Sequence, residues 1–295
     1  MQETLEQGQA TVPDQAENPE PKWVPVNGSH AIQMAYASVI FAQPVTAVIW
    51  NNVQREARAA AAAADLDLEN AIQSMMFQIG PATGPNPATI QNANAGIQFQ
   101  RLQALNVVGE QFVIMPDQLR FETYAYTRWD GFNSKVQSLF KAVLPAYFSA
   151  VNVAQVSLEY TDVFHWSVEG DADCSEIVDT NSPLIAKAAM QPKSQWHSHS
   201  GWFDNQHLGQ RRLSNADITV ADALVQNQPR RAINIRTHEA TQFLIGKDGQ
   251  LIDGPPSNDQ IFSLFENHHL SLKTVLNDML TPIAREMISL GAGNA

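Results

Sequence analysis

One stretch of this chain, residues 119–166, constrains the fold more than any other. It begins with the strand-like run Leu-Arg-Phe-Glu-Thr-Tyr-Ala-Tyr and ends in a second strand-like run that reaches residue 166. Between them, large apolar side chains recur every three or four residues, which is the spacing of one helical face. They are Phe132, Val136, Leu139, Phe140, Val143 and Tyr147. The stretch therefore predicts strand, helix and strand, with a helix that buries a wide apolar stripe.

A second long amphipathic segment lies near the C-terminal end of the chain. Ser257 and Gln260 have the spacing of a capping box, in which two side chains satisfy free backbone N–H groups at a helix start. The stripe that follows consists of Ile261, Phe265, His268, Leu272, Val275 and Met279. Thr281 before Pro282 predicts the N-cap of a further short helix, because proline fits the first helical position. We expect His268, which lies on the stripe, to be either buried and hydrogen-bonded or part of an interface, and not a metal ligand.

Shorter patterns fill the rest of the chain. Apolar spacing predicts a helix over residues 47–64, and residues 80–96, rich in Gly, Pro and Asn, predict a loop. Strands are expected at residues 31–41, 96–102, 107–115, 119–126, 156–166, 194–203, 218–224 and 231–245.

The order of these elements predicts an α+β protein, with long helices packed on one face of one or more antiparallel sheets. Residues 23–152 and 153–291 each read strand, helix, strands and helix, so we expect two pseudo-repeated halves. Residues 1–22 are rich in Gln, Glu and Pro and nearly devoid of large apolar side chains. Such a segment buries too little surface to offset its loss of conformational entropy, and we expect a disordered tail.

Charge and cysteine content argue against several classes of protein. The chain has 18 Lys and Arg against 30 Asp and Glu, for a formal net charge of -12, whereas a duplex-binding surface needs a basic face. Nucleic acid is therefore not an expected partner. The single cysteine, Cys174, excludes an intramolecular disulfide. No apolar run reaches the ~18–20 residues that span a bilayer, so a cytoplasmic protein without a membrane partner is the prediction.

The best indication of an enzyme is the segment Trp-His-Ser-His-Ser at residues 196–200. On a strand, His197 and His199 point to the same face, where two imidazoles can share a zinc ion. Asp217, in Ser-Asn-Ala-Asp, is the candidate third ligand. The pattern resembles the His-x-His and Ser-x-x-Asp motif of zinc-dependent isopeptidases, although here the two parts are further apart. The alternative is a pair of exposed or hydrogen-bonded histidines that hold no cofactor.

Aromatic side chains gather near the ends of the expected strands. Most are expected in the core, but Tyr and Trp combine a large area with a polar group and are common in pockets and interfaces. The candidate binding or interface residues are Tyr126, Trp129, Tyr160, Trp166, Trp196 and Trp202.

The segment Thr-x-x-Tyr-x-x-Trp-x-x-Phe, formed by Thr123, Tyr126, Trp129 and Phe132, precedes the first long helix. This segment, a following Leu-x-Tyr strand and a C-terminal helix bearing His and Leu resemble a sporadically distributed bacterial family of uncharacterised proteins. The strand departs from the family pattern, which is rich in arginine where this chain has Gln, Ser and Glu. The resemblance implies a fold and brings no known catalytic residues.

Taken together, these patterns favour a non-enzymatic binding or interaction module, such as a subunit of a bacterial multi-protein system. A protein partner or a second copy of the chain is the expected partner. Neither a Gly-Lys-Ser/Thr phosphate loop nor a Gly-x-Ser-x-Gly elbow occurs in the sequence. One alternative is a metal-dependent hydrolase built on the His-x-His segment. The other is a sensor with a pocket for a nucleotide-like small ligand between the halves.

Overall fold

The structure is a computed structural model that describes residues 22–78, 89–191, 193–207, 209–225, 228–246 and 250–290. Apart from Lys22, the predicted N-terminal tail lies outside the described residues. No helix within the described part of the chain is long and apolar enough to cross a membrane.

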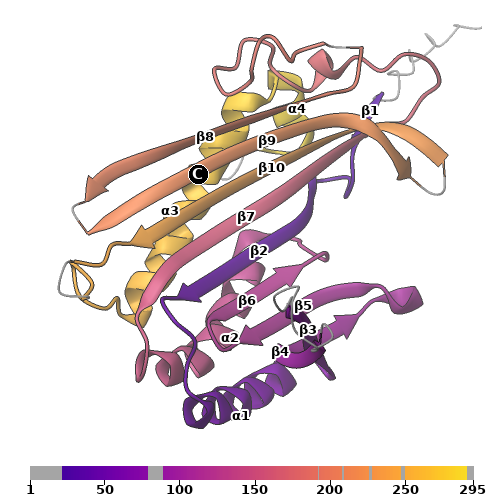
Figure 1. Ribbon diagram of the computed structural model, residues 1–295. Coiled ribbons are helices and arrows are strands. Elements are labelled where there is room, and N and C mark those ends of the chain that lie inside the picture. Colours follow the sequence, from indigo (N-terminus) through magenta and orange to yellow (C-terminus); the bar gives the residue numbers. More distant parts are fainter. Residues whose placement is uncertain are drawn as a thin grey trace, which may run out of the picture.

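A single antiparallel sheet dominates the fold (Figure 1). Its strands are β1 (Trp23–Pro25), β2 (Ile32–Phe41), β3 (Leu68–Gln78), β4 (Thr89–Leu102), β5 (Val108–Met115), β6 (Gln118–Thr123), β7 (Val153–Trp166), β8 (Trp196–His207), β9 (Gln210–Val225) and β10 (Gln228–Phe243). The order along the sheet is β3-β4-β5-β6-β2-β7-β10-β9-β8, and β1 pairs with β7. Strands β2 and β7 form the seam between the two parts of the chain, where Ser38 and Ser157 share a buried hydrogen bond of 2.8 Å between their hydroxyls.

The helices pack on one face of this sheet. In Figure 1 the yellow C-terminal helices lie behind the sheet, and the indigo helix lies below its lower strands. The helices are α1 (Ala47–Ala63), α2 (Trp129–Phe148), α3 (Asn258–Met279) and α4 (Pro282–Met287), and 3₁₀ turns occur at Ala104–Asn106 and Cys174–Glu176. The capping box predicted at Ser257 and Gln260 is confirmed at the start of α3. Thr281 caps α4 by accepting a hydrogen bond from the Ala284 N–H, as predicted. Arg128 is the N-cap of α2, and no side-chain hydrogen bond caps this helix.

The predicted α+β class is wrong in its balance of elements. Ten strands form one sheet, and they contain more of the described residues than the helices do. The second part of the chain also departs from the expected strand, helix, strands and helix order. Between β7 and β8 its only described helical segment is the 3₁₀ turn at Cys174–Glu176. The sheet passes through the β2–β7 seam without interruption, so the chain does not divide into two helix-covered sheets.

Two strands account for much of this error. Strand β3 was not predicted, because Leu-Glu-Asn-Ala-Ile-Gln at residues 68–73 has few β-branched or aromatic residues and a weak strand pattern. The loop predicted at residues 80–96 is wrong from Thr89 onward, where β4 begins and pairs with β3. Gly96 lies inside β4, where a Cβ would collide with the Ile114 carbonyl oxygen of β5. The glycine there allows a close approach of strands and does not mark a loop.

The core consists of two clusters that meet along β7. One lies between the sheet and helices α1, α2 and α3, and takes Val156, Leu158 and Tyr160 from β7. The other takes Phe164 and Trp166 from β7 and is closed by the 3₁₀ turn at Cys174–Glu176, the end of α3 and α4. The alternation along β7 thus aims its apolar side chains at the helices. The opposite face of the sheet is covered by no described helix.

Candidate functional site

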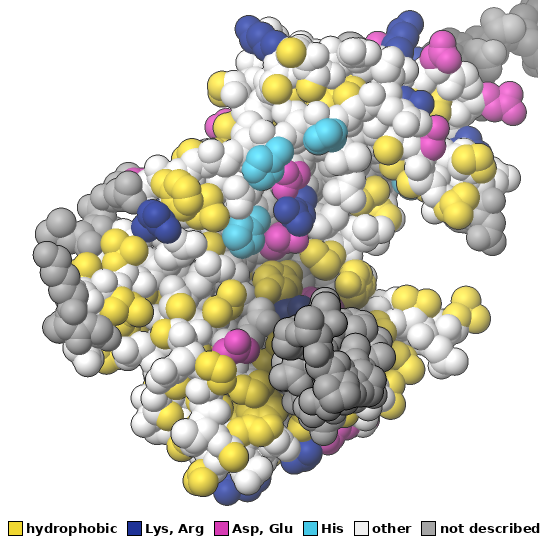
Figure 2. All heavy atoms as spheres, in the orientation of Figure 1, with side chains coloured by type: hydrophobic (Ala, Val, Ile, Leu, Met, Phe, Trp, Pro, Cys, Tyr) yellow, Lys and Arg dark blue, Asp and Glu magenta, His cyan; other side chains and the backbone are white. Residues whose placement is uncertain are grey.

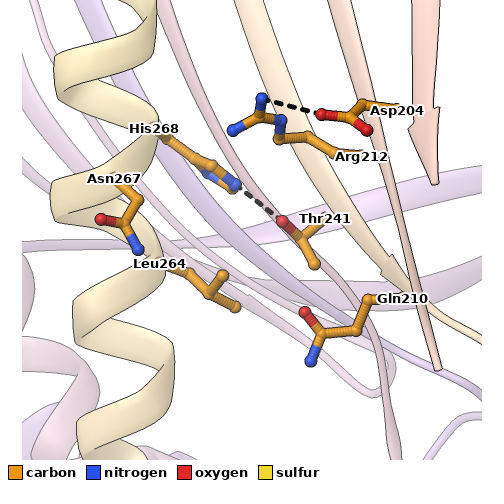
Figure 3. A pocket seen from close by; sticks show the side chains of 7 residues that line it. All are labelled: Asp204, Gln210, Arg212, Thr241, Leu264, Asn267 and His268. Atoms are coloured by element: carbon orange, nitrogen blue, oxygen red, sulfur yellow. Dashed lines mark hydrogen bonds and ion pairs between the residues drawn. The ribbon is translucent and has the colours of Figure 1, made fainter. Parts of the chain in front are cut away.

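A pocket with a volume of about 270 Å³ lies between α3 and the ends of β8, β9 and β10 (Figure 3). The side chains that line it are Asp204, Gln210, Arg212, Thr241, Leu264, Asn267 and His268. The strand register explains this grouping. Asp204 pairs with Arg212 across β8 and β9, and Arg212 pairs with Thr241 across β9 and β10. Side chains at paired positions of neighbouring strands point to the same face, so these three form one row facing α3.

Arg212 is held between two carboxylates. Its Nη2 donates to Asp204 Oδ2 at 3.2 Å, and its Nε lies 3.0 Å from Glu239 Oε1 in an ion pair. Glu239 has no exposed surface, and burial raises the pKa of its carboxyl. A buried carboxylate is stabilised by a nearby cation, so this ion pair places the guanidinium at the pocket wall. The contact lacks hydrogen-bond geometry, because Arg212 Nε and both oxygens of Glu239 have no hydrogen-bond partner among the described residues. No hydrogen bond joins Nη1 of Arg212 to another described residue.

His268 faces Arg212 from α3, as Figure 3 shows. Its side chain is buried, and a hydrogen bond of 2.9 Å joins Nε2 to the hydroxyl of Thr241. This confirms the predicted buried and hydrogen-bonded state. Burial, with a contribution from the positive charge of Arg212, lowers the pKa of His268 to about 3. The imidazole is therefore neutral at physiological pH, and it lines the pocket as a hydrogen-bonding side chain.

The pocket continues into a neighbouring hollow of about 260 Å³. Gln210, Leu264 and Asn267 line both hollows. The second hollow adds the apolar side chains of Phe243, Pro255 and Pro256. We call the two hollows together the α3 pocket. The second hollow is also lined by the polar side chains of Asp253, Gln260 and Ser263, so both hollows mix polar and apolar groups. Such a mixture is the usual construction of a site for a small organic molecule.

The predicted metal residues lie elsewhere, on the face of the sheet away from the helices. His197 and His199 are both exposed, and His199 Nδ1 contacts Asp217 Oδ1. The other oxygen of Asp217 lies 3.0 Å from Nη2 of Arg236, a cation that would repel a metal ion. In the described ranges of the chain, no three His, Cys, Asp or Glu side chains are grouped so that they could hold one ion. The geometry thus lacks the ligand set that the zinc alternative requires.

These residues belong to a charged cluster in the middle of the open face, where Figure 2 shows histidine, arginine and acidic side chains together. On neighbouring strands it includes His238 and Glu159, which pair across β10 and β7. Burial lowers the pKa of His238 and raises that of Glu159, because both side chains are partly withdrawn from water.

The predicted aromatic residues are mostly core. Tyr126, Tyr160, Trp166 and Trp196 are buried. Trp202 is partly buried against the second cluster.

Trp129 packs between helices α2 and α3. Its ring stacks on His269 with centroids 4.2 Å apart, and its Nε1 donates to Glu266 at 2.8 Å. None of the predicted aromatic residues lines the α3 pocket. Tyr126 and Trp129 pack on Phe132 of α2, whereas Trp166 packs on Trp23 of β1.

Arg212, Glu239 and Thr241 were not among the predicted site residues. One signal was present in the sequence. In β10, Ile235, Glu239 and Phe243 fall on the same side of an alternating strand, which places an acidic residue in an apolar row. Such a residue requires a basic partner, but the sequence does not say which strand supplies it.

Comparison of the sequence with protein-family models and with curated proteins gives no match. The function is therefore inferred from the geometry of the site.

Proposed function

We propose that this chain is a binding module whose α3 pocket holds a small molecule with a polar head and an apolar body. The observation that supports this most directly is the guanidinium of Arg212, fixed at the wall by Asp204 and Glu239 with Nη1 unused. A donor that is already positioned loses little conformational entropy on binding, which favours affinity for a ligand group placed opposite it.

The charges of the pocket favour a head group with no net charge. Among the described residues of its lining, the cation is Arg212 and the carboxylates are Asp204, beside it, and Asp253 in the second hollow. Glu239 is fully buried next to Arg212. A purely anionic head would meet the carboxylates, and a purely cationic head would meet the guanidinium. A neutral or zwitterionic head can accept from Arg212 and donate to Asp204. The apolar body would then lie along Leu264 and Phe243.

Binding is a better interpretation than catalysis at this site. A general base works best when its pKa is near the operating pH. Burial keeps the pKa of His268 at about 3, so its imidazole is a weak base. Among the described residues of the lining there is no Cys, and the only Ser, Ser263, lines the second hollow, whereas His268 lines the first. A protein partner or a second copy that reads the bound state remains part of the proposal.

A matched pair of variants on α3 tests the proposal. Asn267→Trp places a large ring in the pocket, whereas Leu270→Trp changes an exposed position on the same helix. We would titrate parent and variants by isothermal calorimetry with leucine, 4-methylpentanoate and 3-methylbutylamine, which share a body and differ in head charge. The expected result is that leucine binds best and that only Asn267→Trp abolishes binding. The proposal would be contradicted if Asn267→Trp and Leu270→Trp bound leucine equally well, or if the parent protein bound 4-methylpentanoate more tightly than leucine.

A further inference from the structure

A second cavity lies between the sheet and α3, away from the α3 pocket. It has a volume of about 80 Å³ and is bounded by β2, β7, β10, α3 and the residues after α4. Its wall is mainly apolar, with Ile32, Leu272, Leu276, Ile288 and Leu290. Asp162 of β7 also faces this cavity, and it is the only acidic side chain among the described residues of the lining.

Asp162 is buried, and one of its two carboxyl oxygens is unpaired among the described residues. Only 1% of it is exposed, and its Oδ2 has no hydrogen-bond partner among the described residues. Burial raises the pKa of this carboxyl to about 7. A buried acceptor that is left unpaired destabilises the fold, and more so when the group is charged. The unpaired carboxyl oxygen of Asp162 does not stabilise the fold, so its presence in the cavity wall is explained by a ligand that pairs with it.

Apart from Lys273, the other polar side chains of the described lining are hydroxyls and imidazoles. Thr237 lies on the adjacent strand and is buried. Tyr160 shares a hydrogen bond of 2.9 Å with His269 Nδ1, and His30 Nδ1 has no partner among the described residues. Burial lowers the pKa of both His30 and His269, so neither imidazole is a cation that would neutralise Asp162.

We propose that this cavity binds a short primary alkylammonium ion, with Asp162 accepting from the ammonium group and the apolar wall enclosing the alkyl chain. An ammonium group has three N–H donors and no acceptor, which suits a carboxylate, a hydroxyl and an unpaired imidazole nitrogen. A metal ion suits the cavity less well, because it needs several oxygen ligands. The volume is roughly half of the ~150 Å³ cavity that admits benzene, so the ligand has few heavy atoms.

Lys273 is the internal competitor for this role, because it also lines the cavity. Among the described residues no carboxylate oxygen lies within 4.0 Å of its ammonium group, so it does not pair with Asp162 in this structure. Its substitution by methionine keeps the length of the side chain and removes the charge. The Lys273→Met variant therefore separates an external ligand from an internal ion pair.

The test is an NMR titration at pH 8, where Asp162 is mostly ionised, with propylammonium chloride against sodium propionate and propanol at matched ionic strength. The expected result is saturable shifts around Asp162 and Thr237 with propylammonium alone. Asp162→Asn should weaken this binding at least tenfold. Asp278→Asn, which removes an exposed charge from α3, should leave it unchanged.

Three results would overturn the proposal. The first is no saturable binding by the parent or by Lys273→Met. The second is binding by Lys273→Met alone, which would make Lys273 the natural occupant. The third is equal binding by parent and Asp162→Asn. If Asp162→Asn fails to fold, Thr237→Val provides the second variant, and unchanged affinity there would count against the proposed acceptor set.

Discussion

The Nε atom of Arg212 lies 3.0 Å from Oε1 of Glu239, a side chain with no surface exposed to water. Arg212 belongs to β9 and Glu239 to β10, so the pair joins two neighbouring strands beneath the first hollow of the α3 pocket. The pair fixes the position of the guanidinium as much as it stabilises the fold, because replacing a buried ion pair by apolar residues is often neutral for stability. The pair therefore determines where the guanidinium stands.

Arg212→Met should lower the free energy of unfolding by about 3–5 kcal/mol, because it leaves Glu239 buried without a cation. Urea denaturation followed by circular dichroism measures this. Arg236→Met is the control, since Arg236 pairs with the partly exposed Asp217 on the open face and should cost less than about 1 kcal/mol. Adding Glu239→Leu to Arg212→Met should restore much of the loss. Equal losses for the two arginines would contradict the assignment.

Asp162 should make the protein less stable as the pH rises. Its pKa is about 7 in the folded chain, above the ordinary value of 3.8. Between these values the folded state holds a proton that the unfolded state has released, so its contribution to stability is lost as the pH rises toward 7. Asp162→Asn should remove this slope and gain roughly 2–4 kcal/mol over the parent at pH 8. The urea midpoints of the parent protein and of Asp162→Asn at pH 5 and pH 8 measure this difference. Midpoints that change with pH by the same amount in both proteins would refute the prediction.

His268 should act in the opposite direction at acidic pH. Its pKa is about 3 when folded, below the ordinary value of 6.5, so the unfolded chain takes up a proton that the folded chain refuses. The contribution of the neutral His268 imidazole to the free energy of unfolding is complete above pH 6.5 and is lost as the pH falls toward 3. His268→Gln keeps a hydrogen-bonding side chain near Thr241 and should flatten the acid limb of the stability profile. His197→Gln, at an exposed position, should leave that limb unchanged.

Replacing both His197 and His199 by alanine should change the free energy of unfolding by no more than about 0.5 kcal/mol, because both side chains are exposed. Elemental analysis of the purified protein is the second measurement. Since Asp217 is already paired with Arg236, no stoichiometric zinc is expected in either form. Zinc at one ion per chain that disappears in the double variant would favour the hydrolase alternative over the binding module.

Ser257→Ala should lower the free energy of unfolding by about 1 kcal/mol, because Ser257 accepts from the Gln260 N–H at the start of α3. Thr46→Ala is a matched control, since Thr46 stands at the N-cap of α1 without a side-chain capping bond. Its effect should be smaller. Thermal unfolding of the two variants would decide, and a larger loss at Thr46 would show that the capping assignment is wrong.

Local patterns predicted the parts of the fold that depend on neighbours in sequence. The stripe from Phe132 to Tyr147 and the capping box at Ser257 both correspond to the helices observed. Strand β3 and the first residues of β4 were missed, because their side chains carry a weak pattern and they are strands through pairing with each other. The predicted aromatic residues were identified by type, and type alone does not separate a packing residue from a lining one.

The chain's own periodicity determined where α2, α3 and their caps lie, since a helix is built from contacts three and four residues apart. Only the tertiary structure decided that one sheet crosses the Ser38–Ser157 seam, because register between distant strands depends on pairing across the whole chain. The same holds for the α3 pocket. Asp204, Arg212, Glu239 and His268 come from four separate elements, and cross-strand register with helix docking brings them together.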